Sequence, residues 1–468
     1  MITKNAVRPF GIRDKIGYLL GDFGNDFTFL LSSGFLLKFY TDVMQVNAGI
    51  VGIVIMLARF LDAFTDVTMG RICDKSRPRE NGKFKPWILR MCAPVAIASF
   101  LIYQSAFRSY DTRFKILWLV VTYILWGSIF YTSINIPYGS MASTISRDPG
   151  ERQSLSTYRT MGSTLAGVIV GAGIPLLAYD IKVINGFEIA ELNGSRFTLI
   201  AGIFSILAII AYVLCYFLVT ERVIPENKEA VESRSIKDLL LSAVKNRALI
   251  SIIVASVLML LSQFTLQQMA NYVFPDYYGN TTAQSAATIA MLIGMLIAAA
   301  VARPLALRFG KAEISVFSNI AAALVCILLF FVRPANVWVY VGFNLFCWLG
   351  LGVFSMVSWA LITDVIDYSE LKNGVREDGS IYAMYSFARK MGQAAAAGLT
   401  GLFLTLVGYE KIEGQPLASS VKEGIFSIST LVPAIGFLLL SAVLWFWYPL
   451  NKKTVDENVR LLKEKHNQ

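Results

Sequence analysis

Long apolar runs dominate this sequence and restrict what it can fold into. Hydrophobic residues make up 55% of its 468 residues, and charged residues only 16%. Many of the runs reach about 18 residues or more, which is roughly the length that a helix needs to cross a bilayer. We therefore predict an all-α, multi-pass membrane protein.

The apolar runs predict twelve spans, separated after the sixth by a charged stretch. They lie near 15–40, 48–72, 87–106, 115–140, 154–178, 197–219, 248–273, 283–305, 313–332, 337–366, 380–408 and 423–447. The chain then divides into an N-terminal six-helix half (1–219), a cytoplasmic connector (220–247) with an expected surface helix at 235–244, a C-terminal six-helix half (248–447) and a cytoplasmic tail (448–468). Two six-helix halves around a midplane site are typical of secondary transporters.

The charged residues predict orientation and exclude several classes of protein. Loops on the N-terminal side hold about 26 Lys and Arg against about 8 on the other side, which predicts a cell (inner or plasma) membrane location with both termini cytoplasmic. The net charge of +10 then reflects topology rather than nucleic-acid binding. The only histidine, His466, follows the last span, and we find no nucleophile motif or soluble domain. We expect no enzyme activity and no cofactor.

The five cysteines show no disulfide or metal-ligand pattern. All of them fall in or beside apolar spans, and we expect free, buried thiols at Cys73, Cys92, Cys215, Cys326 and Cys347.

The second span carries charges that need an explanation. Asp62 and Asp66 are four residues apart, so they share one helical face about 6 Å apart along the axis, and Arg59 lies on the same face. Each charge near the bilayer centre costs roughly 2.5–3.5 kcal/mol on insertion scales. We interpret the pair as a cation site made of hard oxygen ligands or proton acceptors. The alternative is an internal salt bridge that only holds helices together.

The first and fifth spans carry a second group of charges. Asp22 and Asp26 again share one face, and Asp26 is expected near mid-membrane. Either they contact substrate or they form a structural or gating pair. Arg159 is a donor fork suited to hydroxyls or a carboxylate, and its alternative role is an ion pair with Asp22 or Asp26. Arg152 opens the fifth span and is assigned to gating.

Asn135 lies beside a helix-breaking residue in the fourth span. Pro137 frees a backbone carbonyl and predicts a kink, which a membrane helix tolerates where polar groups face a cavity. We therefore place Asn135 in that cavity.

The second half supplies further polar groups. Asp364 and Asp367 end the tenth span, and with Arg376 they are interpreted as gate ion pairs. In the eleventh span, Lys390 shares a face with Ser386, and we expect it to pair with the carboxylates of the second span. Trp359 is placed to stack on a sugar ring, with a core or lipid-facing position as the alternative.

Taken together, these motifs resemble one transporter family over about residues 12–450. The matching segments are the second span, Gly82–Trp87, Asn135–Ser140, Asp364–Glu370 and Ser386–Gln393. The chain is similar to the glycoside–pentoside–hexuronide:cation symporters of the major facilitator superfamily, whose best-known member is melibiose permease. The segments Asn135–Ser140 and Ser386–Gln393 look most like the glucuronide and xyloside members.

The resemblance implies alternating access, with sugar entry coupled to Na⁺ or H⁺. It implies cation binding at Asp62 and Asp66 with help from Thr65 and Ser386, the aspartates being the metal ligands if the ion is Na⁺. It implies sugar contacts from Asp26, Asn135, Arg159 and Lys390, and we expect Trp359 to line the same cavity. The expected partners are a glycoside, a monovalent cation and membrane lipid.

Three departures from melibiose permease limit what carries over. Asn135 replaces a sugar-binding aspartate, Thr65 replaces an asparagine beside the cation site, and Asn25 replaces a lysine. Melibiose and that permease's cation preference therefore do not transfer. We expect a glucuronide or other hexuronide, or a pentoside, as the substrate. A Na⁺-coupled lysolipid transporter and a non-transporting sugar sensor of the same fold are the alternatives.

Overall fold

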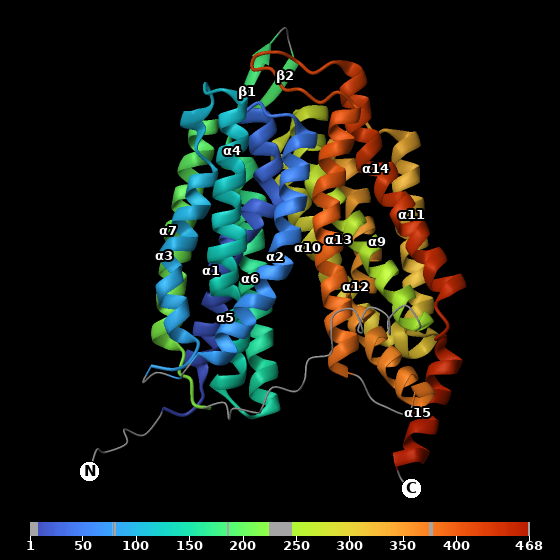
Figure 1. The fold of residues 1–468 in the computed structure, drawn as a ribbon. Helices are drawn as coiled ribbons and strands as arrows, with labels where there is room; N and C mark the ends of the chain where they lie inside the picture. The colour runs from blue at the N-terminus through green and yellow to red at the C-terminus, as the bar shows by residue number, and fades with distance from the viewer. Residues whose placement is uncertain are drawn as a thin grey trace, which may run out of the picture. The chain divides into compact units, whose positions relative to one another are not determined.

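The computed structural model describes residues 8–76, 78, 81–184, 187–223, 246–373 and 378–466. The chain forms two compact units (Figure 1). The N-terminal unit comprises Met1–Glu229 together with Tyr409–Pro416, and the C-terminal unit comprises Ala230–Gly408 and Leu417–Gln468. Most of the predicted connector, including its expected surface helix at 235–244, lies outside the described residues.

The N-terminal unit consists of helices and one hairpin. Its elements are α1 (Ile12–Lys38), α2 (Ala48–Lys75), α3 (Lys85–Ile102), α4 (Thr112–Tyr123), α5 (Thr132–Ile145), α6 (Pro149–Leu177), β1 (Tyr179–Ile184), β2 (Phe187–Leu192) and α7 (Gly194–Leu218). A π-helical segment, Ile124–Tyr131, joins α4 to α5, and another, Phe39–Val43, extends α1.

In the C-terminal unit, helices are the only regular secondary structure among the described residues. Its elements are α9 (Arg247–Tyr272), α10 (Thr281–Phe309), α11 (Lys311–Val332), α12 (Val337–Asn373), α13 (Asp378–Leu406), α14 (Ser419–Ala442) and α15 (Lys452–His466). π-Helical segments, Val273–Tyr277 and Val443–Trp447, extend α9 and α14.

The predicted helical membrane protein is confirmed, with two additions. Ten helices in the described chain are long and apolar enough to cross a membrane. Helices α1 and α13, of 27 and 29 residues, are as long but are not among these ten. The predicted loop between the fifth and sixth spans contains the antiparallel β1–β2 hairpin, paired from Tyr179 with Leu192 to Ile184 with Phe187. The predicted tail contains α15.

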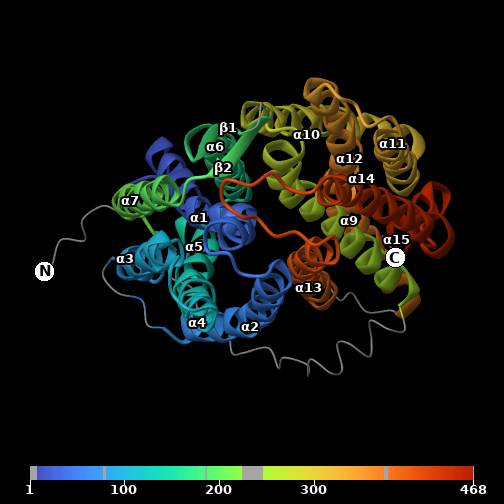
Figure 2. The same cartoon turned by 90° about the horizontal axis from the view of Figure 1, so that it is seen from above.

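Each unit repeats the same packing plan. In the N-terminal unit, α1 packs on α6 and α7, α2 packs on α5, and α3 packs on α5 and α7 (Figure 2). In the C-terminal unit, α9 packs on α13 and α14, α10 packs on α12, and α11 packs on α12 and α14. The helix order along the chain is the same in both plans. The repeat that hydropathy suggested is therefore present in the helix packing of each unit.

A close helix crossing positions the charges of the N-terminal unit. A Cβ atom at Gly162 of α6 would lie 2.3 Å from the backbone oxygen of Leu19 in α1. Only a residue without a side chain permits this approach. Asp22 and Arg159 each lie three residues from this contact on their own helices, so the crossing brings them together.

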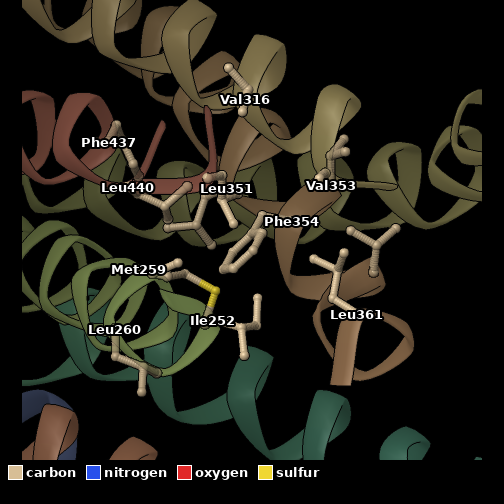
Figure 3. Packing of buried hydrophobic residues seen from close by; sticks show 14 of the residues in the cluster. Ile252, Met259, Leu260, Val316, Leu351, Val353, Phe354, Leu361, Phe437 and Leu440 are labelled. Carbon is tan, nitrogen blue, oxygen red and sulfur yellow. The ribbon is translucent and has the colours of Figure 1, made fainter. Parts of the chain in front are cut away.

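The C-terminal unit has a dense apolar core. Ile252 and Met259 of α9 lie beside Leu351 and Phe354 of α12, and Leu440 of α14 closes the cluster (Figure 3). All five side chains have an exposed fraction of 1% or less. Their burial fixes α12 against α9, and α12 carries several of the predicted site residues.

Buried charges tie together one end of the N-terminal unit. Asp14 is fully buried and pairs with Arg8 and Arg222, at 2.8 and 2.9 Å. Glu221, just beyond α7, accepts hydrogen bonds from the backbone N–H groups of residues 83–85 at the start of α3. A carboxylate at a helix N-terminus satisfies donors that have no partner within the helix.

The other end of this unit holds the segment Tyr409–Pro416. The Lys38 ammonium lies 2.9 Å from the Tyr409 hydroxyl and 2.8 Å from Asp42, and the Tyr409 hydroxyl also donates to Asp42. Glu413 pairs with Arg108 and, more distantly, with Lys182 of β1.

A cavity of about 270 Å³ lies at this end and is lined mainly by charged and polar side chains. The Glu191 carboxylate of β2 accepts from the backbone N–H of Gly414 and pairs with Lys182. The segment Tyr409–Pro416 is therefore held by side chains of α1, β1, β2 and the turn after α3.

Candidate functional site

Two hydroxyls from a neighbouring element bind the carboxylates of α2. The Ser128 hydroxyl donates to Asp62 Oδ1 at 2.5 Å, and the Thr132 hydroxyl donates to Asp66 Oδ1 at 2.8 Å. Both pairs have a spacing of four residues, so donors and acceptors match turn for turn. Ser128 lies in the π-helical segment before α5, and Thr132 begins α5. The result is a row of two carboxylates and two hydroxyl oxygens.

Arg59 does not neutralise this row directly. Its guanidinium lies 5.5 Å from the centroid of the Phe29 ring and close to Tyr123. Within the described residues, neither Asp62 nor Asp66 forms an ion pair with Arg59. The alternative of an internal salt bridge that only holds helices together stays open, because it does not depend on Arg59. The Thr65 hydroxyl donates its proton to the Asp62 backbone oxygen. The lone pairs of the Thr65 hydroxyl oxygen therefore remain available to a cation.

Arg159 of α6 forms an ion pair with Asp22 of α1. The Nε atom lies 2.9 Å from Asp22 Oδ1, and the guanidinium lies over the ring of Tyr138, 5.4 Å from its centroid. The Tyr138 hydroxyl donates to the backbone oxygen of Tyr18, which fixes the ring. This ion pair is the alternative role that the sequence analysis left open for Arg159. The Asp22 carboxylate balances the positive charge of the Arg159 guanidinium.

Asp26 lies one turn after Asp22 on α1. It is close to Ser163 and Arg159 of α6, but the ion pair with Arg159 is made by Asp22. Asn135 is half-buried on α5, three residues after Thr132 and therefore on the same helical face. Among the described residues of this unit, Asp22 therefore has an ion-pair partner and Asp26 has none.

The prediction that Arg152 forms a gating ion pair is wrong for the described chain. Its Nε donates to the Ser146 backbone oxygen at 2.8 Å, and its Nη2 donates to that of Ser143 at 3.3 Å. The last carbonyl groups of a helix have no hydrogen-bond partner within the helix. Those at the end of α5 therefore accept hydrogen bonds from the Arg152 guanidinium.

The predicted gate residues of the C-terminal unit are partly paired. Asp364 of α12 lies 2.5 Å from the ammonium of Lys311, at the start of α11. Asp367 is half-buried one turn later on α12. Arg376 lies outside the described residues.

The C-terminal unit presents an aromatic group around Trp359. The side chain of Trp359 is 41% exposed, so the alternative of a core position is wrong. Its ring stacks on Tyr382 at 5.1 Å between centroids, and it meets Tyr385 edge-on at 5.1 Å. Ser386 and Lys390 lie on the same helix, α13, and both are half-buried. The predicted pairing of Lys390 with the aspartates of α2 joins the two units and stays a prediction.

Several residues of these groups were not predicted. Ser128 and Thr132 are hydroxyl residues at the spacing of the two aspartates, inside an apolar run, and this matched spacing is a usable signal. Tyr382 and Arg389 share a face of α13 with Tyr385. No three His, Cys, Asp or Glu side chains come together as a metal site among the described residues. A bound Na⁺ would therefore need hydroxyl or backbone oxygens beside Asp62 and Asp66.

Comparison with protein families identifies the chain's class. The family described as MFS/sugar transport protein matches residues 17–452. The chain belongs to this family of major facilitator sugar transporters. The match covers nearly all of the chain and includes every site residue considered above. The resemblance to sugar symporters is confirmed, and the protein is a membrane transporter rather than an enzyme.

Curated relatives cover the whole length of the chain. It is 30% identical to a glucuronide carrier protein homolog of Escherichia coli, over 96% of this chain and 94% of the relative. It is 29% identical to a putative sulfoquinovose importer of Salmonella typhimurium, over 98% and 94%. It is 26% identical to an uncharacterized symporter, YjmB, of Bacillus subtilis, over 100% and 98%.

Solved structures share the fold. A bacterial homolog of the human lysosomal transporter Spinster superposes with a TM-score of 0.66 at 12% identity, covering 96% of this chain and 97% of that one. The D-xylose–proton symporter superposes with a TM-score of 0.61 at 14% identity, covering 94% and 98%. These likenesses show the major facilitator fold alone.

Proposed function

We propose that this transporter is a symporter that couples Na⁺ or H⁺ entry to uptake of a glycoside by alternating access. The substrate we propose is a glucuronide or other hexuronide, or a pentoside. The observation that carries the coupling is the row formed by Asp62, Asp66 and their hydroxyl partners Ser128 and Thr132. Carboxylate and hydroxyl oxygens suit a hard monovalent cation, and a carboxylate also accepts a proton.

Each unit offers polar or aromatic groups that suit a sugar. In the N-terminal unit, Asp26 and Asn135 offer acceptors and donors to sugar hydroxyls, while Arg159 holds Asp22 and sets the local charge. In the C-terminal unit, the exposed ring of Trp359 offers an apolar face to a sugar ring. Support for a sugar comes from the family match and from the names of the relatives.

Coupling follows if cation and sugar stabilise the same conformational step. A cation at Asp62 and Asp66 neutralises them and frees Lys390 from its proposed pairing, which changes the charge around the sugar. Each ligand then raises the affinity for the other by the same factor. Typical couplings are about 1–3 kcal/mol, which corresponds to about 5- to 150-fold.

Uptake into proteoliposomes tests this proposal. A labelled glucuronide and a labelled xyloside are each supplied under a Na⁺ gradient, a pH gradient or neither. We expect accumulation of at least one sugar under one gradient. Asp66→Asn should abolish accumulation against a gradient while the purified protein remains folded. Asp180→Asn, which removes a carboxylate paired with Arg196 at the hairpin, is the control and should accumulate normally. Gradient-driven accumulation by Asp66→Asn would refute the cation site.

A further inference from the structure

A guanidinium in the C-terminal unit is surrounded by aromatic groups rather than by carboxylates. Arg389 lies eleven residues after Asp378, the first residue of α13, or about 16 Å along the helix. Its guanidinium is 5.7 Å from the centroid of the Trp359 ring and 5.7 Å from that of Tyr385. Its only hydrogen bond to a described residue goes to the Tyr385 hydroxyl, at 3.5 Å. Among the residues that the structure describes, no carboxylate pairs with Arg389.

The surroundings hold this side chain in place. Tyr382, Tyr385 and Arg389 are spaced by three and four residues, so they lie on one face of α13. The Tyr385 hydroxyl accepts from Ser256 of α9 at 2.8 Å or donates to it, and the Tyr385 ring is fully buried. Trp359 comes from α12, so three helices position the guanidinium.

The rings beside Arg389 are open rather than buried. The side chain of Trp359 is 41% exposed and that of Tyr382 is 53% exposed, and their rings stack at an interplanar angle of 24°. A guanidinium has five N–H donors in a planar fork that matches a carboxylate or sulfonate. A cation next to an exposed apolar ring face is the arrangement that an anionic sugar requires.

Arg389 differs from Arg159 and Lys390, the two other cationic side chains expected to contact the sugar. Arg159 already has its carboxylate partner in Asp22, at 2.9 Å. Lys390 follows Arg389 directly, so its side chain leaves the helix about 100° away from that of Arg389. A charge inside a membrane helix is costly without a partner, and a substrate anion would supply one.

We propose that Arg389, next to the rings of Trp359 and Tyr382, binds the anionic group of an acidic sugar and makes this transporter selective for anionic over neutral sugars. This inference rests on the proposed transport of a sugar and adds a specificity-determining residue to it. The shared ligand chemistry is a sugar unit carrying a carboxylate or a sulfonate. The guanidinium binds the anion through paired N–H donors, and the ring face contacts the sugar's C–H groups.

The test is substrate-selective kinetics in proteoliposomes under the gradient that drives uptake. The probes are a methyl glucuronide, a methyl sulfoquinovoside and a neutral methyl xyloside. The variants are Arg389→Gln, Arg389→Lys and the control Arg303→Gln, which removes an exposed arginine of α10 from the same unit. A charge-assisted hydrogen bond is worth enough to change affinity by about 10- to 100-fold.

We expect Arg389→Gln to raise the KM of an anionic probe by about 10- to 100-fold, while the KM of the xyloside changes by less than about 2-fold. Arg389→Lys should fall between, because it keeps the charge but loses the fork. Arg303→Gln should match the unaltered protein. A response to only one anionic probe identifies the carboxylate or the sulfonate as the group that is bound.

Three outcomes overturn the inference. These are equal changes for anionic and neutral probes, no change for any probe, and transport of the xyloside alone by the unaltered protein. In the last case the proposed function stands and the anion site fails. Accumulation of no probe by the unaltered protein under any gradient would instead contradict the proposed function itself.

Discussion

Replacing Thr132 by valine removes one hydroxyl from the proposed cation site with little change in shape. In the structure this hydroxyl lies 2.8 Å from Asp66 Oδ1 and 3.1 Å from the backbone oxygen of Gly127. A hydroxyl has one proton, and the charged carboxylate is the stronger acceptor. A hydrogen bond to a charged group contributes about 1.5–3 kcal/mol, or about 10- to 150-fold in an equilibrium constant.

The direction of the effect should reveal the coupling ion. If the ion is Na⁺, Thr132→Val removes a ligand oxygen and the restraint on Asp66, so the half-saturating Na⁺ concentration should rise about 10- to 150-fold. If the ion is H⁺, losing a donor to the charged carboxylate strengthens proton binding. The half-saturating proton concentration should then fall by the same factor.

The assay is initial-rate sugar uptake into proteoliposomes over a range of Na⁺ concentration and, separately, of pH. The control is Thr144→Val, which changes a fully buried threonine of the same helix; among the described residues, its hydroxyl bonds only the Met141 backbone oxygen. An unchanged cation dependence in Thr132→Val, with both variants folded, would show that Asp66 and its hydroxyl partner do not form the coupling site.

Two further predictions concern the N-terminal unit. Gly162→Ala should lower the free energy of unfolding by about 1–3 kcal/mol, because the added methyl meets the Leu19 carbonyl, whereas Gly173→Ala on the same helix meets no atom within 4 Å and should not. Thermal melts of the two purified variants compare them, and equal melting temperatures would refute the close crossing. The pKa of Glu413 is held below its usual 4.5, chiefly because the Arg108 guanidinium hydrogen-bonds its carboxylate. The stabilisation by this ion pair is thus complete above about pH 4.5 and is lost as the pH falls through the lowered pKa. A spin label at residue 410 of the unaltered protein should gain mobility only in acid. In Glu413→Gln the label should already be mobile at neutral pH. Equal label mobility in the two proteins at neutral pH would contradict this prediction.

The sequence predicted those features that depend on periodicity along one helix. The apolar runs predicted the membrane helices, and the four-residue spacing of Asp62 and Asp66 predicted that the two side chains share one helical face. Partners from another helix were harder to foresee, because helical periodicity says which side chains share a face but not which neighbour that face meets. Ser128 and Thr132 were therefore missed. The capture of Arg152 by carbonyls at the end of α5 was missed for the same reason.

Some misses had a signal that local rules can detect. Residues 179 to 183 alternate apolar and polar side chains, and Asn185-Gly186 is a dipeptide favoured in tight hairpins, so the β1–β2 pair was predictable. Arg389 shares helical spacing with Tyr382 and Tyr385, a pattern that is also legible in the sequence. The attachment of Tyr409–Pro416 to the N-terminal unit leaves no trace in hydropathy.

That attachment has a consequence for how the protein is made. Ribosomes deliver the chain from its N-terminus, and all of the N-terminal unit except Tyr409–Pro416 has been synthesised once residue 229 is reached. The Tyr409 hydroxyl that meets Lys38, and the Glu413 carboxylate that meets Arg108, arrive only after residues 230–408 have followed. The first half of the gene therefore encodes an incomplete domain, and a fragment ending in the connector would leave Lys38 and Arg108 without these partners.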